Sequence, residues 1–226
     1  MWQVGMPVGV MYGADLIGIA VFQLMIAQAS VPGAAATQII ITITSLAYQP
    51  AIGIATAGTT FVGQAIGAGR YELARRYGNR AIALCVAWMG CAAVFLLLAG
   101  AAIARFFLGA DDAAAQAALA IALQILWPAA AYQVFDGLYF GAGFALRAAG
   151  DTRVPAVAAL VLSWFVFVPL AHALIFTPQQ AWFGGLPQFG WGAFGGWIAL
   201  MSYAIVLGSL IFVRWRLGAW RRLVRL

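Results

Sequence analysis

Long apolar stretches dominate this sequence and restrict what it can fold into. A helix needs about 20 apolar residues to cross a bilayer, and six stretches reach that length: residues 7–29, 37–66, 81–104, 113–147, 154–176 and 192–213. Only 8% of the residues are charged, whereas soluble domains carry about 25%. The sequence therefore predicts an all-α membrane protein in which residues 1–226 form one bundle of six transmembrane helices. Residues 30–33 (SVPG) are expected to form the turn that closes the first helix.

The arginines predict how this bundle is oriented. The three segments that share one side of a six-span topology hold eleven of them, and the opposite side holds one. The eleven are Arg70, Arg75, Arg76, Arg80, Arg147, Arg153, Arg214, Arg216, Arg221, Arg222 and Arg225, and the twelfth is Arg105. Positively charged segments stay on the cytoplasmic side, so both termini are expected in the cytoplasm. Nucleic-acid binding is not indicated, because the arginines sit at the ends of apolar stretches rather than on a solvated face.

Two aspartates lie inside the predicted spans at similar depth. Asp136 precedes Arg147 by eleven residues, roughly 16 Å of helix, and Asp15 follows Gly5 by ten residues, roughly 15 Å. Carboxylates at mid-membrane are expensive and usually functional. Such a pair can hold a proton or an inorganic cation such as Na⁺, so both aspartates are predicted to bind one of these ions. A neutral aspartate hydrogen-bonded to a neighbouring helix is the structural alternative for each.

Further polar residues, four of them within about one helical turn of an aspartate, are weaker candidates for the lining of a cavity: Tyr12, Gln49, Tyr132, Gln133 and Tyr139. Gln49 also ends a stripe of polar residues at steps of four, three and four along the stretch 37–66, which comprises Gln38, Thr42, Ser45 and Gln49. That spacing places the stripe on one helix face. We expect this face to look into a cavity or the bundle interior, with interhelical hydrogen bonding as the alternative.

Enzymatic chemistry is not predicted. The single histidine lies in a different span from either aspartate, and Cys85 and Cys91 lie six apart on different sides of one helix, which disfavours a disulfide or metal site. No cofactor is expected besides H⁺ or Na⁺ bound at the aspartates. An intramembrane aspartyl protease also needs two aspartates on facing helices, but its Gly-x-Gly-Asp sequence is missing at Asp15 and Asp136.

Four segments together resemble the MATE (multidrug and toxic compound extrusion) transporters, in particular their NorM-like branch. They are residues 5–15 (GMPVGVMYGAD), 50–55 (PAIGIA), 62–69 (VGQAIGAG) and 145–155 (ALRAAGDTRVP). The family has twelve spans in two lobes, and this chain is similar to the C-terminal lobe, helices seven to twelve. The resemblance implies cation coupling by Asp15 on the first helix, where Glu is common in the family, and by Asp136 on the fourth. Ala148 departs from the glycine that often follows the arginine.

The resemblance implies multidrug efflux across the bacterial inner membrane, by antiport of H⁺ or Na⁺ against organic compounds, chiefly cations. The expected partners are drugs, the lipid bilayer, and either the N-terminal lobe of the same transporter or a second copy of this chain. Met1 opens almost directly into a span, which is unusual for a complete transporter and is typical of a fragment. A lipid-linked oligosaccharide flippase of related fold and a non-catalytic structural membrane subunit are the alternatives.

Overall fold

The computed structural model describes residues 2–109, 112–182, 185 and 187–221; within its first helix, the side chains of residues 2–8, 10–12, 14 and 15 fall outside this description. All regular structure in the described ranges is helical. Five helical segments are long and apolar enough to cross a membrane, one of them the continuous stretch Arg153–Ile175. The first helix has a shorter apolar part, Leu16–Ala29. The predicted fold class, an all-α membrane bundle, is confirmed. In chain order the elements are α1 (Trp2–Ala29), α2 (Val31–Gly67), α3 (Tyr71–Leu108), α4 (Ala113–Ala148), α5 (Arg153–Leu162), the π-helical segment η1 (Ser163–Phe167), α6 (Val168–Ile175) and α7 (Gly192–Leu217).

The connection between α1 and α2 is a single residue, Ser30, where a longer turn over residues 30–33 was expected. The Ser30 hydroxyl accepts a hydrogen bond from the Gly33 backbone N–H at 2.9 Å, and Pro32 occupies the first helical turn. Serine at the cap and proline just inside are both favourable at a helix start. The segment SVPG therefore opens α2 rather than forming a loop.

Two helices end in the same left-handed glycine turn. After α4, Gly150 has a φ of +78°, and the Asp151 N–H donates to the Leu146 carbonyl at 2.9 Å. After α2, Gly69 has a φ of +71°, and the Arg70 N–H donates to the Ala65 carbonyl at 2.9 Å. This hydrogen-bond pattern is the Schellman motif, which favours glycine at the left-handed position.

The third and fifth predicted helices differ from the observed ones. The helix expected to begin at residue 81 already begins at Tyr71. Residues 71–80 are too polar to belong to a membrane span, so the hydropathy of the sequence did not include them, but they continue the same helix. The helix expected over residues 154–176 is interrupted by η1, which is followed by Pro169 in the first turn of α6. Proline lacks the N–H for the normal helical bond and crowds the carbonyl four residues earlier, which favours an irregular helix just before it.

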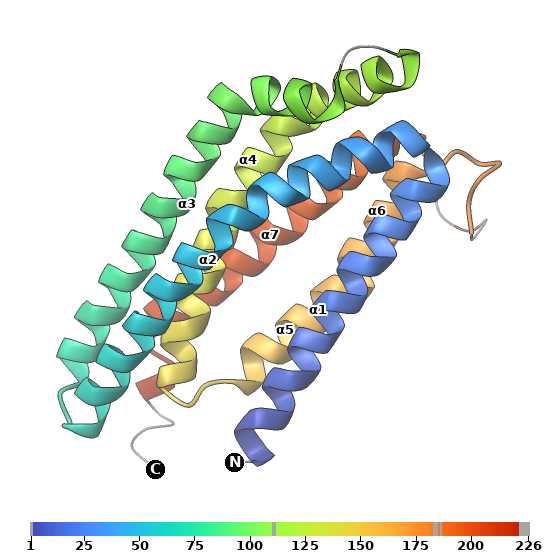
Figure 1. The fold of residues 1–226 in the computed structure, drawn as a ribbon. Coiled ribbons are helices and arrows are strands. Elements are labelled where there is room, and N and C mark those ends of the chain that lie inside the picture. The colour runs from blue at the N-terminus through green and yellow to red at the C-terminus, as the bar shows by residue number, and fades with distance from the viewer. Residues whose placement is uncertain (1, 110–111, 183–184, 186, 222–226) are drawn as a thin grey trace.

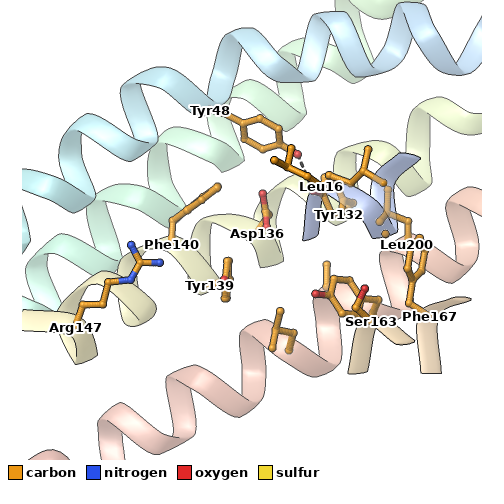
Figure 2. A pocket seen from close by; sticks show the side chains of 15 residues that line it. Leu16, Tyr48, Tyr132, Asp136, Tyr139, Phe140, Arg147, Ser163, Phe167 and Leu200 are labelled. Atoms are coloured by element: carbon orange, nitrogen blue, oxygen red, sulfur yellow. Dashed lines mark hydrogen bonds between the residues drawn. The ribbon is translucent and has the colours of Figure 1, made fainter. Parts of the chain in front are cut away.

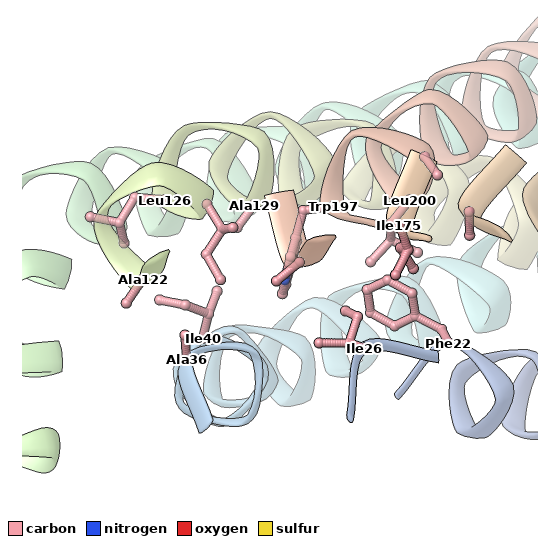
Figure 3. Close-up of a cluster of buried hydrophobic side chains, with 14 of the residues drawn as sticks. Phe22, Ile26, Ala36, Ile40, Ala122, Leu126, Ala129, Ile175, Trp197 and Leu200 are labelled. Carbon is pink, nitrogen blue, oxygen red and sulfur yellow. The ribbon is translucent and has the colours of Figure 1, made fainter. Parts of the chain in front are cut away.

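The helices form two groups of unequal size (Figure 1). Helices α2, α3, α4 and α7 pack into one bundle, and α1 lies beside α5 and α6. The groups meet at the end near Ser30, where a buried apolar cluster joins Phe22 of α1, Ile40 of α2 and Trp197 of α7 (Figure 3). The opposite end, which we call the arginine-rich end, holds every described arginine except Arg105.

Candidate functional site

Asp136 lies on the wall of a cavity of about 230 Å³ between the two helix groups. Helices α1, α2, α4, η1 and α7 all contribute to this wall, which we call the Asp136 cavity (Figure 2). Its lining consists of Leu16, Gly18, Ile19, Tyr48, Tyr132, Asp136, Tyr139, Phe140, Arg147, Ser163, Phe167, Leu200, Tyr203, Ala204 and Leu207. The only described carboxylate that lines it is Asp136.

One face of α4 supplies the polar side of this cavity. Tyr132, Asp136 and Tyr139 are spaced by four and three residues, so they point in similar directions on a helix, and all three line the cavity. Two of them, Tyr132 and Tyr139, were predicted cavity-lining residues. Each of these three side chains is only partly buried, which leaves the carboxylate accessible from the cavity.

Two tyrosine hydroxyls connect α2 with α4 beside the carboxylate. The hydroxyl oxygens of Tyr48 and Tyr132 are 2.7 Å apart and hydrogen-bonded. The Asp136 side chain hydrogen-bonds the Tyr48 hydroxyl and acts electrostatically on Tyr132 as well. A hydroxyl can both donate and accept, whereas an ionised carboxylate only accepts. Ionised Asp136 therefore accepts a hydrogen bond from the Tyr48 hydroxyl, and the Tyr48 and Tyr132 hydroxyls share a second hydrogen bond.

Helix α1 reaches the Asp136 cavity through its backbone. A methyl group added at Gly18 would lie 2.8 Å from the Ser163 hydroxyl oxygen of η1, so the glycine permits a close approach of these two elements. Leu16, adjacent to Asp15 in sequence, also lines the cavity. Asp15 and Tyr12 lie on α1, but their side chains fall outside the described residues, and their roles stay predictions.

The other two candidates lie away from this cavity. Gln133 lines a second cavity of about 530 Å³ on the neighbouring face of α4, because consecutive helical residues point about 100° apart. Gln49 is exposed on the surface of α2, as are the other members of the polar stripe, Gln38, Thr42 and Ser45. Tyr48, next to Gln49, is the α2 residue that enters the Asp136 cavity.

Sequence reasoning missed several lining residues, among them Tyr48, Ser163, Tyr203 and Arg147. Arg147 was expected only to mark the membrane surface, but it lines the cavity and its guanidinium carbon lies 4.5 Å above the centre of the Phe144 ring. The signal that could have found it was its spacing of eleven residues, three helical turns, from Asp136. Ser163 could have been suspected from the proline six residues later, which disturbs the helix.

The residues of the Asp136 cavity suit a proton or a hard cation better than a transition metal. Among the described side chains, no group of three or more His, Cys, Asp or Glu residues could hold a metal ion. The oxygen atoms available are one carboxylate and the hydroxyls of tyrosine and serine. Hard cations prefer oxygen ligands.

Comparisons with known proteins agree with this architecture. The sequence pattern of the MatE family matches residues 7–172. The chain belongs to the MatE family. The multidrug resistance protein NorM of Burkholderia vietnamiensis is 32% identical over 204 residues, which cover 90% of this chain and 43% of that protein. A probable NorM of Deinococcus radiodurans is 32% identical over 188 residues, covering 81% and 42%.

Solved MATE structures share the fold. A MATE transporter in a bent conformation superposes with a TM-score of 0.80 at 17% identity, over 100% of this chain and 47% of that one. An inward-facing multidrug resistance MATE transporter of the MOP superfamily superposes with a TM-score of 0.77 at 19% identity, over 98% and 48%. The chain thus spans about half the length of the MATE proteins that it matches, and it is a multi-pass membrane protein.

Proposed function

We propose that this chain is the C-terminal six-helix lobe of a MATE multidrug exporter, which exchanges H⁺ or Na⁺ for organic compounds, chiefly cations. The observation that carries the proposal is the position of Asp136. Its carboxylate belongs to a membrane-spanning helix and lines a cavity between two helix groups. Membrane-embedded carboxylates in such positions commonly bind coupling ions. The family membership supplies the transport context.

In the proposed mechanism, ion binding at Asp136 changes how the helix groups pack. A proton or Na⁺ on Asp136 removes the charge that orders the Tyr48 and Tyr132 hydroxyls, and these belong to different helices, α2 and α4. An ion moves a conformational equilibrium only through different affinities for its two states. The two states here are alternating-access conformations, in which one lobe rocks against another around the substrate.

The remaining parts of the proposal concern location and partners. Asp15 is the second coupling carboxylate, on the helix whose neighbouring residue Leu16 lines the same cavity. The lobe works against an N-terminal lobe or a second copy of itself, in the bacterial inner membrane, with the arginine-rich end in the cytoplasm. Crosslinking two differently tagged copies in membranes separates these partners: a tagged homodimer supports the second copy, and its absence supports the separate lobe.

The direct test is Asp136→Asn, expressed from the native gene and assayed by ethidium efflux in everted membrane vesicles. Ion-driven efflux should fall more than about tenfold, because Asn cannot exchange a proton or carry the charge that binds Na⁺. Asp112→Asn is the matched control: it is the same change on the same helix, at an exposed N-cap where Asn also serves well. Undiminished, ion-dependent efflux by Asp136→Asn at normal expression would refute the assignment.

One observation favours a second candidate, a flippase for lipid-linked oligosaccharides. Arg147 lies on the wall of the same cavity, and a cationic residue suits the anionic phosphate of such a lipid. A flippase should stop with Arg147→Gln and continue with Asp136→Asn. An exporter of organic cations should stop with Asp136→Asn.

A further inference from the structure

The second cavity, of about 530 Å³, lies on the seam between α2 and α3, and Gln133 of α4 belongs to its lining. We call it the Gln133 cavity. Its volume is within the range of small-molecule sites, about 300–1,000 Å³. It does not share a lining residue with the Asp136 cavity. Its lining consists of Thr42, Ile43, Leu46, Ala47, Trp88, Cys91, Ala92, Phe95, Leu96, Ile103, Phe107 and Gln133.

Helix α3, which supplies much of the cavity wall, packs closely on α4. Methyl groups added at Gly141 or Gly137 would lie 2.6 Å from the Ile82 Cα atom and 2.9 Å from the Met89 Cβ atom, so the helices touch closely at both glycines. One turn before Gly137, the same face of α4 carries the much larger Gln133. The cavity that Gln133 lines also has residues of α2 and α3 in its wall.

Gln133 is buried without full hydrogen bonding. Its side chain is 1% exposed, and its Oε1 atom has no hydrogen-bond partner among the described residues. Buried acceptors nearly always have partners, and an unpaired one destabilises the fold. The hydrocarbon core of a membrane contains no donor to replace the missing one. The acceptor therefore points to a ligand that supplies an N–H or O–H group.

The walls of the cavity suit an aromatic molecule. Trp88 is held in place by a hydrogen bond from its Nε1 atom to the Ala47 carbonyl at 2.9 Å, and Phe95 and Phe107 add further rings. Trp88 is 41% exposed and Phe95 is 57% exposed, so the mouth opens at the surface of a membrane-spanning bundle. Where this surface faces lipid, molecules dissolved in the bilayer can approach it.

We propose that the Gln133 cavity binds a membrane-soluble aromatic molecule that carries a single hydrogen-bond donor, with the donor on Gln133 Oε1 and the rings against Trp88 and Phe95. The inference does not depend on the transport function proposed above, because it concerns a different face of α4 and its test measures binding rather than efflux. Cys91 provides the readout: it is an exposed free thiol on the cavity wall, whereas Cys85 is buried.

The test uses 2-naphthol and 2-methoxynaphthalene, which share a ring system but differ in the O–H donor. Purified protein in lipid nanodiscs is alkylated with N-ethylmaleimide, and mass spectrometry follows the rate at Cys91. We expect 2-naphthol to protect Cys91 at a concentration about tenfold lower than 2-methoxynaphthalene, as one hydrogen bond to a buried acceptor implies. The alkylation rate of free glutathione, measured alongside, controls for direct effects of either compound on the reagent.

Two variants make the result specific. Gln133→Leu removes the acceptor at similar volume, so the tenfold preference for 2-naphthol should disappear. Differences in lipid partitioning cancel, because the same two compounds are compared in both proteins. Ala92→Leu narrows the cavity beside Cys91 and leaves Gln133 intact, so both compounds should protect Cys91 less, while the preference for 2-naphthol remains. Equal protection by both compounds in the unmodified protein, a preference that survives Gln133→Leu, or a thiol that is unreactive or unprotected throughout would each overturn the proposal.

Discussion

Two neighbouring faces of α4 differ in packing and in chemistry. The face with Tyr132, Asp136 and Tyr139 borders a cavity, and its polar groups are partly exposed and connected to α2. The face with Gly137 and Gly141 is closed against α3, with contacts that leave no room for a methyl group. One face is therefore suited to change its contacts during a functional cycle, and the other to keep them. Stability and activity should respond to substitution at different faces.

The largest effect should come from Asp136→Asn, which is expected to separate activity from stability. Ion-driven efflux should fall more than about tenfold, while the thermal unfolding midpoint in detergent stays the same or rises, because a costly intramembrane charge has been removed. Fluorescence-detected unfolding of the purified protein measures the second quantity. A midpoint lowered by more than about 3 °C would mean that this face also stabilises the fold.

The next largest effect should occur where both faces end, in the turn after α4. Asp151 is 2% exposed and its Oδ2 atom lies 2.7 Å from Arg214 Nε of α7. Breaking a buried ion pair leaves an uncompensated charge, so Asp151→Ala should destabilise the fold by about 3 kcal/mol. The matched control is Glu72→Ala, which breaks the pair with Arg221 where Glu72 is 71% exposed, and should cost below about 1 kcal/mol. Equal losses in a denaturant titration would contradict the difference in burial.

A smaller loss of stability should follow from Gly141→Val on the closed face. The new side chain would meet the Ile82 backbone, and overpacking of this kind costs about 1–3 kcal/mol. Gly143→Ala on the same helix is the control, because its methyl group would meet only Tyr139, at 4.0 Å. If both variants unfold at the same temperature as the parent, the closed face is not the stabilising one.

The smallest effect should come from Tyr132→Phe on the cavity face. It removes one hydroxyl that is hydrogen-bonded to Tyr48, and a single hydrogen bond contributes about 1 kcal/mol, or about fivefold in ion affinity. Tyr48→Phe should not add fully to it in the double variant, since the two hydroxyls act through one contact. The dependence of efflux on ion concentration measures these shifts. Full additivity would indicate that the hydroxyls act on Asp136 separately.

Periodicity in the sequence predicts which residues share a helix face, but not which neighbour that face meets. It was enough for the bundle class and for the grouping of Tyr132 and Tyr139 with Asp136, because these residues lie on the same helix. It was not enough for Gln49 and Tyr48, which are adjacent in sequence: the rotation of α2 against α4 decides which of them enters the cavity. The same limit applies to Gln133, which sits one residue from Tyr132 but faces α3.

Helix boundaries show a second limit, which arises from competing local signals. Ser30 and Pro32 occur in turns and at helix starts alike, and only the geometry of the cap distinguishes the two. The π segment at Ser163–Phe167 depends on how η1 fits against α1 and α7, which Pro169 alone does not determine. Contacts between distant segments therefore decide what local sequence leaves open.

The single-residue connection at Ser30 means that a small change of angle there would displace the other end of α1 by a large distance. A helix of 28 residues is about 42 Å long, and α1 is joined to α2 at one end by one non-helical residue. A rotation of about 10° at this joint would move the far end of α1 by about 7 Å, with almost no displacement near Ser30. Small adjustments around Phe22 and Trp197 would thus become large movements at the arginine-rich end, and a single crosslink between α1 and its neighbour α5 at that end would hold α1 in place.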